Sequence, residues 1–329
     1  MLSTDLYNKV LLEPAKKGCN KLLIISGYAT SAMAFHHLSD LKKINPDFEV
    51  HLILGMCAQD GLSKSNHKGF QKLMDDDFSD KFTCSYVPNC PPVHSKAYIW
   101  LKDNMLSKAF TGSANYTQTA FGKAQRELMS ECSAKEAYDY FGSFSAETIY
   151  CNHQDAETLV TVYRDQTYDR LRQQKKLVED KLPVAPNGVV LEGLPFERLS
   201  FLDNNGNLPE RSGLNWGQRP EEHREPNQAY IRIPLAVGNS GFFPEKGVNF
   251  TVYTDNDKVL ICARKQANGK GIQTPHNNSI MGEYFRTRLG VPLGAKVTKK
   301  HLLVYGRTDV TFYKIDDETY YMDFSKPIK

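Results

Sequence analysis

The sequence predicts an α/β domain followed by an all-β barrel or sandwich. In the first half, continuous apolar runs alternate with helical patterns, as where Leu22–Ser26 precedes Ser31–Lys43. Beyond Pro183-Val184-Ala185-Pro186-Asn187-Gly188 the pattern changes to short alternating runs, separated by turn-forming Asn-Gly and Asp-Asn sequences. A chain of 329 residues also exceeds the usual size of one hydrophobic core, so two domains are expected.

The first half supplies further strand and helix signals in the same order. Val50–Met56 is an apolar run, the helical pattern Ser65–Asp76 follows, and Phe82–Val87 is typical of a strand. Strands that alternate with helices favour a mostly parallel sheet. Gly27-Tyr28 and Gly55-Met56 stand at strand ends, where open α/β sheets bind ligands. Tyr28 therefore either lines a site or is an ordinary rim aromatic.

A helix over Lys135–Tyr150 is expected to close the first domain. From Asp155 to Asp180 a polar segment carries apolar residues at roughly helical spacing, which predicts a linker helix. This helix is either a solvated connector or a surface that pairs with a partner's copy. The expected boundaries are 1–153 for the α/β domain, 154–189 for the linker and 190–329 for the β domain.

The β domain is expected to contain short strands and one clear helix, Ser279–Leu289. Regularly spaced short strands between turn signals are typical of barrels and sandwiches. The predicted strands are Leu199–Leu202, Ala229–Ile233, Phe250–Tyr253, Val259–Ala263, His301–Tyr305, Val310–Ile315 and Thr319–Asp323.

The composition permits nucleic-acid binding without proving it. Residues 190–329 contain 19 Lys and Arg against 16 Asp and Glu, whereas residues 1–189 contain 22 of each.

No apolar run is long enough to cross a bilayer, and the N-terminus lacks the apolar core of a signal peptide. Seven cysteines without paired C-x-x-C spacing fit neither a disulfide framework nor a zinc module. We therefore expect a cytoplasmic protein with reduced cysteines.

The densest chemistry lies between Val93 and Glu127. His94 and Lys96 are two residues apart in a run that alternates like a strand, so both side chains are expected to project from one face. An imidazole in that position can attack phosphorus, and the neighbouring ammonium can neutralise the charge that develops on the phosphate oxygens. Neither task needs a metal or another cofactor, and none is expected.

The run Leu106–Thr111 is expected to return as a second strand and to bring Ser113 and Asn115 to the same place. Their hydroxyl and amide groups add hydrogen-bond donors for a phosphate. Glu127 begins the next predicted strand, where its carboxylate can accept the remaining imidazole N–H and fix the orientation of the ring. Taken singly, His-x-Lys is usually a surface pair, and Gly-Ser-x-Asn usually a tight turn.

The ordered set of His94-x-Lys96, Gly112-Ser113-x-Asn115 and Glu127 resembles the phospholipase D superfamily motif. In that superfamily the histidine forms a covalent phosphoenzyme. An aspartate usually follows the lysine by five residues, where this chain has Leu101. The missing aspartate weakens a lipase assignment and leaves the nuclease branch unaffected, since that branch often lacks it.

Two polar loops in the second half have the composition of base readers. Residues 212–219 set Asn, Gln and Arg around a Trp, and residues 264–278 are similarly polar. These side chains can make bidentate contacts to adenine and guanine in the major groove. Either loop alone is more simply a solvated polar loop. The candidate DNA-binding residues are Asn215, Trp216, Gln218, Arg219, Lys270, Gln273, Thr274, His276 and Asn278.

Together, the nuclease motif and a pseudobarrel with GLNWGQR and GEYFR segments resemble type II restriction endonucleases of the NgoFVII kind. That resemblance implies a plant B-three-like domain that grips double-stranded DNA with an N-arm, here Leu214–Arg219, and a C-arm that includes Lys270–Asn278. With one motif per chain, the second histidine is expected from another subunit, which implies a homodimer through the nuclease domain. Whether a separate ATPase and a cognate methyltransferase act with it stays open.

Two alternatives compete with this hypothesis. A nonspecific nuclease or lipid phosphodiesterase of the same superfamily would keep the first domain, although the chain has no basic amphipathic helix of the kind that binds membranes. A DNA-binding regulator with an inactive first domain is the second. It would have no reason to keep His94, Lys96, Asn115 and Glu127 together.

Overall fold

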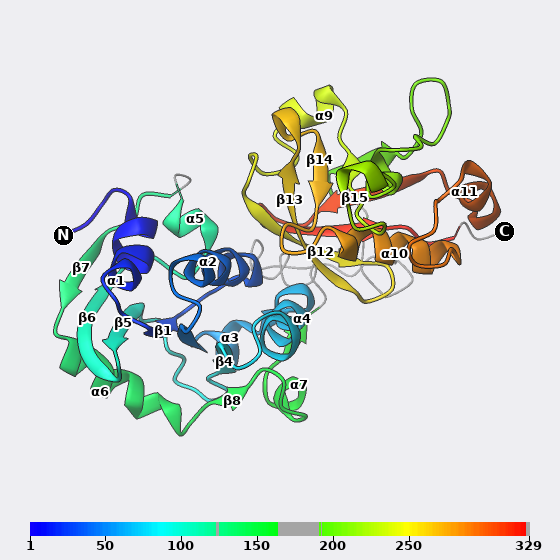
Figure 1. Ribbon diagram of the computed structural model, residues 1–329. Coiled ribbons are helices and arrows are strands. Elements are labelled where there is room, and N and C mark those ends of the chain that lie inside the picture. The colour runs from blue at the N-terminus through cyan, green and yellow to red at the C-terminus, as the bar shows by residue number, and fades with distance from the viewer. Residues whose placement is uncertain (123–124, 164–190, 192, 327–329) are drawn as a thin grey trace. The chain divides into compact units, whose positions relative to one another are not determined.

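The structure is a computed structural model that describes residues 1–122, 125–163, 191 and 193–326. The chain divides into two compact units, Met1–Lys175 and Lys176–Lys329, and each is described by itself (Figure 1). Among the described residues, no helix is long and apolar enough to cross a membrane.

The first unit is built on a seven-stranded mixed sheet in the order β7-β6-β5-β1-β2-β4-β8. Only the pairs β1–β2 and β2–β4 are parallel, so the prediction of a mostly parallel sheet is wrong. The reason is that β5, β6 and β7 follow one another as antiparallel neighbours, without helical crossovers. The strands are β1 (Lys21–Ser26), β2 (Glu49–Leu54), β4 (Phe82–Tyr86), β5 (Ala97–Lys102), β6 (Met105–Gly112), β7 (Met129–Cys132) and β8 (Ile149–Tyr150).

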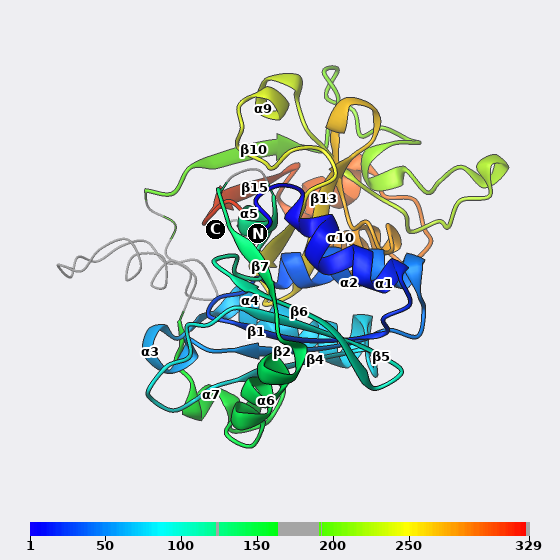
Figure 2. The same cartoon turned by 90° about the vertical axis from the view of Figure 1, so that its left-hand side faces the viewer.

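Helices cover both faces of this sheet. Figure 2 shows α1 (Glu13–Lys16) and α2 (Ser31–Ile44) on one side and α6 (Ala134–Ser145) on the other. Side chains of Thr30 and Ser133 cap the first turns of α2 and α6 by accepting backbone N–H groups. The remaining helices are η1 (Tyr7–Leu12), α3 (Cys57–Asp60), α4 (Lys64–Lys72), η2 (Leu73–Asp77), α5 (Gln118–Phe121) and α7 (Ala156–Leu159).

Three predicted elements of the first unit differ from the structure. The strand expected from Val93 begins only at Ala97, because its partner β1 ends at Ser26 and offers no further pairing. The helix expected to reach Tyr150 ends at Ser145, and the chain then turns to pair β8 with β4. The predicted linker helix is interrupted after α7 by β9 (Val162–Tyr163), which pairs with β3 (Leu62–Ser63). Its residues 164–180 lie outside the described part.

The second unit is a seven-stranded sheet in the order β10-β15-β16-β12-β13-β14-β11 that curls into a near-closed barrel. Its core is rich in aromatic side chains, with Phe250, Phe312 and Tyr320 fully buried. The strands are β10 (Phe196–Ser200), β11 (Ile231–Arg232), β12 (Asn249–Thr254), β13 (Val259–Lys265), β14 (Gly271–Gln273), β15 (Asp309–Lys314) and β16 (Thr319–Asp323).

The helix predicted over Ser279–Leu289 is confirmed as α10, which buries Met281 and Phe285 in the barrel core. The strand predicted over His301–Tyr305 is wrong, because these residues form α11 (Lys299–Tyr305). Thr298 and His301 make a reciprocal capping box there, and Gly306 ends the helix in a left-handed conformation. Strand β14 was not predicted. The other helices of the unit are η3 (Gly213–Asn215), η4 (Pro220–Glu222), α9 (Leu235–Asn239) and η5 (Ala267–Gly269).

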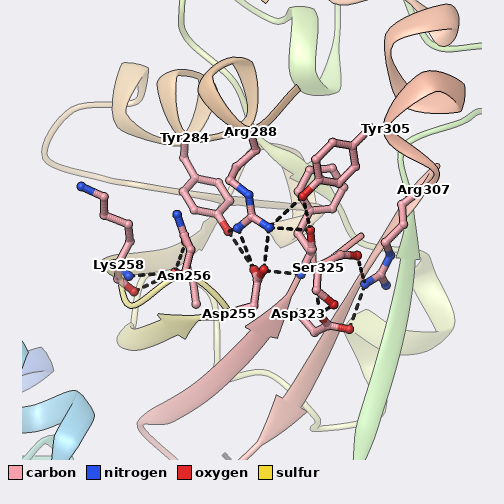
Figure 3. A network of polar contacts seen from close by, with 11 residues as sticks. Asp255, Asn256, Lys258, Tyr284, Arg288, Tyr305, Arg307, Asp323 and Ser325 are labelled. Carbon is pink, nitrogen blue, oxygen red and sulfur yellow. Dashed lines mark hydrogen bonds and ion pairs between the residues drawn. The ribbon is translucent and has the colours of Figure 1, made fainter. Parts of the chain in front are cut away.

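A partly buried ion pair joins α10 to the strand ends of this barrel (Figure 3). Arg288 on α10 lies 2.5 Å from Oδ2 of Asp255, which directly follows β12. Its guanidinium also donates to the Tyr305 hydroxyl of α11 and to the Phe324 carbonyl after β16. The Asp255 hydrogen bond raises the pKa of Arg288 and offsets the effect of burial, so the arginine stays charged. The Arg288 side chain therefore links α10 to three other segments of the unit, the end of β12, α11 and the chain after β16.

Candidate active site

The motif proposed from the sequence lies where the carboxyl ends of β1 and β2 meet the segment before β5. Backbone hydrogen bonds link Gly55 N to Ser26 O at 2.9 Å and Val93 N to Gly55 O at 3.0 Å. A β-carbon on Gly55 would stand 1.9 Å from the Val93 carbonyl oxygen, so only glycine permits this approach. These contacts hold residues 93–96 against the strand ends without making them a strand.

His94 and Lys96 project to the same place, as predicted, although neither belongs to β5. Nζ of Lys96 lies 3.1 Å from Nε2 and 3.2 Å from Nδ1 of the His94 imidazole, and it donates to the His94 carbonyl at 2.6 Å. His94 is exposed, whereas Lys96 is buried. An exposed imidazole beside a buried ammonium is a suitable arrangement for attack on a bound phosphate.

Glu127 is bonded to the turn that carries Ser113 and Asn115. Its carboxylate accepts a hydrogen bond from the Ser113 hydroxyl. Burial lowers the pKa of Lys96, and the Glu127 carboxylate partly opposes that shift, so these two groups are close enough to interact electrostatically. We had expected Glu127 to accept the imidazole N–H of His94. The structure instead puts the Lys96 amine beside the ring and pairs Glu127 with Ser113.

Asn115 presents its amide with a defined orientation. Its Oδ1 accepts a hydrogen bond from the Tyr28 backbone N–H at 3.1 Å and lies 3.4 Å from the Ser26 hydroxyl. With the oxygen engaged by donors, the NH2 group is the side that remains to donate to a ligand. A β-carbon on Gly27 would stand 3.0 Å from Cδ2 of His94 and 3.5 Å from this oxygen, so both side chains border Gly27.

Tyr28 borders the site, and Asp60 was missed by the sequence analysis. The Tyr28 ring packs edge-on against the His94 imidazole, with centroids 6.0 Å apart and an interplanar angle of 78°. Its hydroxyl donates to the Asp60 carboxylate at the end of α3. The two residues are separated by 32 positions, and nothing in the local sequence indicates the pair.

Neither Leu101, at the position of the usual superfamily aspartate, nor Asp103, two residues further on, reaches the site. Leu101 is buried in the apolar cluster beneath α6. Asp103 lies in the turn between β5 and β6, where it accepts a hydrogen bond from the Asn20 side chain at 3.2 Å. Among the described residues, no group of three or more His, Cys, Asp or Glu side chains gathers as in a metal site.

In the second unit, several predicted DNA-binding residues hold the loops rather than protrude from them. Asn215 is fully buried and bonds to Pro209 O, Val297 O and Val297 N, which uses both ends of its amide. Gln218 donates to Pro226 O and Gly294 O. In this conformation the amide of Asn215 has no free atom left for a base.

The predicted C-arm residues divide into two groups, those bonded within the protein and those exposed to solvent. Gln273 and Thr274 are buried, with Gln273 bonded to Gln266 and Thr274 to the Asn277 carbonyl. The Asn278 carbonyl accepts the Ala229 N–H and joins this loop to β11. Lys270 and His276 are exposed, and they are the candidates on this loop that a duplex can reach.

Trp216 and Arg219 lie at the partly exposed surface of the N-arm. The guanidinium of Arg224 stacks 4.3 Å from the Trp216 ring centroid, and the Tyr230 ring packs edge-on against the same indole. Arg219 donates to the Arg211 carbonyl and to Glu222. Arg224 was not among the predicted residues, although an arginine five positions after Arg219 in a Glu-rich loop is a usable signal.

The GEYFR segment, Gly282–Arg286, bonds to the chain that follows the N-arm. Arg286 on α10 is fully buried and donates to the carbonyls of Ala295, Pro226 and Asn227. Gly282 is required four residues earlier, because a β-carbon there would stand 1.6 Å from the Asn227 oxygen. Burial lowers the pKa of Arg286, and Glu225 and Glu283 oppose that shift.

Comparison with known families covers both units. Residues 4–158 match the NgoFVII restriction endonuclease N-terminal PLD domain, and residues 190–316 match the NgoFVII C-terminal B3-like DNA-binding domain. The chain belongs to the NgoFVII restriction endonuclease family. The first unit of this NgoFVII family member is thus a nuclease domain of the phospholipase D type, and its barrel is a DNA-binding domain.

Some solved structures resemble part of this NgoFVII family member at low sequence identity. NucT from Helicobacter pylori is 16% identical with a TM-score of 0.31, and the match covers 44% of this chain and 91% of NucT. Nuc from Salmonella typhimurium, a phospholipase D family member, is 15% identical with a TM-score of 0.31, and the match covers 44% of this chain and 89% of Nuc. Polyphosphate kinase from Porphyromonas gingivalis is 16% identical with a TM-score of 0.31, and the match covers 52% of this chain and 26% of the kinase. No curated protein sequence matches the chain.

Proposed function

We propose that this restriction endonuclease cleaves double-stranded DNA at a specific sequence, without a metal, through a phosphohistidine at His94. The observation that carries the proposal is the exposed His94 imidazole held beside the buried Lys96 ammonium. A histidine can attack phosphorus directly, and a fixed cation stabilises the charge that develops on the phosphate oxygens. The phosphodiester class of substrate follows from the family.

The reaction has two steps. The His94 imidazole attacks the phosphorus, a P–N bond forms, and the bond to the leaving oxygen breaks as that oxygen takes a proton from a general acid. Water then attacks the phosphohistidine, the P–N bond breaks, and His94 is restored. Lys96 and the NH2 group of Asn115 bind the phosphate oxygens through both steps. Ser113 and Glu127 form the far side of the same group.

The general acid comes from a second copy of the chain. The sequence contains one His-x-Lys motif, so the chain supplies a single histidine of this kind. Two nuclease units that meet across a two-fold axis bring the partner subunit's His94 to the opposite side of the phosphate. That imidazole protonates the leaving oxygen and then removes a proton from the attacking water.

The barrel domain supplies the sequence specificity. Of the predicted residues on its two loops, Lys270 and His276 are exposed, and Trp216 and Arg219 are partly exposed. Arg224, which was not predicted, stacks on the Trp216 ring. Arginine suits bidentate contact to guanine, and lysine suits phosphate contact. The buried amide of Asn215 and the partly exposed amide of Gln218 fix the loop that carries them.

The test is cleavage in a chelator by wild-type protein and the His94→Ala variant. A selection with randomised duplexes first supplies a cognate site. We expect the wild type to cut that site in EDTA, and His94→Ala to bind it with unchanged affinity and cut at least about a thousandfold more slowly. Activity that disappears in EDTA and returns with magnesium contradicts the histidine mechanism. A His94→Ala variant that cuts at more than about a hundredth of the wild-type rate removes His94 from the role of nucleophile.

A further inference from the structure

Tyr28 contacts both residues that face the proposed phosphate. Its ring edge rests on the His94 imidazole, and its backbone N–H donates to Oδ1 of Asn115 at 3.1 Å. Its hydroxyl donates to the Asp60 carboxylate. One half-buried residue therefore connects the candidate nucleophile, the candidate phosphate donor and a carboxylate on α3.

The loop that carries Tyr28 is fixed on both sides. Before it, the fully buried Ser26 hydroxyl accepts the Tyr116 N–H at 2.9 Å and donates to the Tyr28 carbonyl at 2.5 Å. After it, the Thr30 N–H donates to the Tyr116 carbonyl at 3.1 Å. Tyr116 directly follows Asn115, so the Tyr28 loop and the Asn115 turn are bonded at three successive points. A shift of Tyr28 must therefore shift Asn115.

The contacts restrict the conformations of both candidate site residues. Rotating the Asn115 amide by a half-turn would bring its NH2 group against the Tyr28 N–H, donor against donor, and would point the oxygen towards the phosphate. The Tyr28 ring, in a T-shaped contact with the His94 imidazole, limits rotation of that imidazole on the side where the two rings meet. Side-chain orientation of this kind has a large effect on rate, because a displacement of about 1 Å at a reacting group costs about 100-fold.

We propose that Tyr28 is a positioning residue of the nuclease site, held in place by Asp60. The inference rests on the proposed function of His94 and Asn115. Tyr28 acts through those two residues, and Asp60 acts through Tyr28. Loss of the Tyr28 side chain slows the chemical step without changing affinity for DNA, because the barrel domain binds the recognition sequence.

The experiment measures single-turnover cleavage and cognate-duplex affinity for four variants of the full chain. We expect Tyr28→Ala to slow cleavage by about 100-fold. Tyr28→Phe and Asp60→Ala, which each remove the same hydrogen bond, should slow it by about fivefold to tenfold. Asp60→Asn keeps an acceptor for the hydroxyl and should stay within about twofold of wild type. Affinity should be unchanged in all four.

The matched control is Tyr7→Phe. Tyr7 lies in the same unit and donates its hydroxyl to the Asp40 carboxylate at 3.0 Å, away from His94. The Tyr7→Phe substitution removes a tyrosine–aspartate bond equivalent to the one lost in Tyr28→Phe. We therefore expect both variants to show a similar change in melting temperature, and Tyr7→Phe to show no change in cleavage rate. An equal loss of rate in Tyr7→Phe would show that Tyr28 contributes only to stability, and would overturn the proposal.

A double-mutant cycle tests the route of the effect. Tyr28→Ala keeps the backbone N–H that bonds Asn115, so the cycle tests whether the Tyr28 side chain holds that N–H in position. If it does, Tyr28→Ala should slow the Asn115→Ala variant much less than it slows the wild type. Fully additive losses would overturn this route. A His94→Ala variant measured in parallel separates the two hypotheses: an active His94→Ala refutes the proposed function, whereas an inactive one with full activity in Tyr28→Ala refutes only the role of Tyr28. If Tyr28→Ala fails to fold, Tyr28→Phe and Asp60→Ala decide.

Discussion

Gly27 lies close against the His94 ring: a β-carbon on residue 27 would stand 3.0 Å from Cδ2 of the imidazole. It would also stand 3.3 Å from Cγ of Met56, so a side chain at position 27 would be crowded by both residues. Gly27 is therefore needed for space and not for an unusual backbone angle.

Replacing Gly27 by alanine should displace the nucleophile while leaving the fold intact. We expect Gly27→Ala to slow cleavage by about tenfold to 100-fold, because the ring must move by several tenths of an ångström. The measurement is single-turnover cleavage beside a thermal melt. Gly142→Ala on α6 is the control, since a β-carbon there meets no atom within 4 Å; it should leave the rate unchanged and stabilise the helix by about 0.5–1 kcal/mol. Equal rates for wild type and Gly27→Ala would contradict the predicted crowding.

Mixed dimers should show whether two chains share one site. When wild-type and His94→Ala chains are mixed, heterodimers lack one of two imidazoles and should be as inactive as the mutant homodimer. The expected activity therefore falls with the square of the wild-type fraction. With only one site per dimer, the strands of a supercoiled plasmid should be cut in turn, and a nicked form should accumulate. A linear dependence on the wild-type fraction would mean that each chain works alone.

Arg219 and Lys270 should contribute differently to DNA binding. If Arg219 reads a base, Arg219→Ala weakens the cognate duplex by about 1–3 kcal/mol and random DNA much less. If the exposed Lys270 contacts phosphate, Lys270→Ala weakens both duplexes alike and lowers the salt slope by about one. Titrations at several salt concentrations measure both effects. Equal loss on cognate and random DNA would reassign Arg219 to the backbone.

Removal of the Arg286 side chain should destabilise the barrel rather than alter its surface. Arg286→Met leaves the buried Asn227 carbonyl and the part-buried bonds to the Pro226 and Ala295 carbonyls without their donor, which costs about 3 kcal/mol or more. Chemical denaturation followed through Trp216 fluorescence measures this. Arg232→Met, at an exposed position on β11, is the control and should change the free energy of unfolding by less than about 0.5 kcal/mol. A stable Arg286→Met protein would show that solvent replaces these bonds.

The nuclease unit should lose stability in mild acid because of His37. Burial lowers the pKa of His37 from 6.5 to about 4, so the folded state keeps it neutral while the unfolded state binds a proton below pH 6.5. Stability is therefore complete above pH 6.5 and falls between pH 6.5 and 4, by about 3 kcal/mol in total. Unfolding followed through Trp100 in a Trp216→Phe background measures it. His37→Gln should remove the His37 share of this dependence and leave the part due to His51 and His67, whose pKa values burial also lowers. Replacing the more exposed His36 by glutamine should retain the full dependence.

The sequence predicted most of the barrel and the chemistry of the motif, because both depend on local patterns. Alternation with period two identifies strands such as Thr319–Asp323, which β16 matches. It failed at His301–Tyr305, where the apolar run is a helix that buries only Leu302 and Tyr305 and exposes Leu303 and Val304. Hydropathy alone does not distinguish these two cases in so short a run.

Prediction of individual site residues from the sequence was limited for a different reason. Residue type indicates what a side chain can bond to, but not whether a neighbour has already taken that bond. Asn215 and Arg219 have equally suitable chemistry for a base, yet the amide of Asn215 is buried and both of its ends already bond to backbone groups. The pairing of Tyr28 with Asp60 joins distant positions, and it depends on the ends of β1 and β2 lying side by side.

The separation between Asn215, Gln218 and Arg286 on the inside and Arg219, Lys270 and His276 towards the solvent bears on how such enzymes diverge. Substitutions at the outward positions leave the interior bonds of the arms untouched, so a lineage can sample new target sequences while its folding stability stays nearly constant. The inward positions do not share this freedom, since each of them bonds to two or more backbone groups. New cleavage specificities in this lineage should therefore arise by exchange of the outward side chains on an unchanged internal framework.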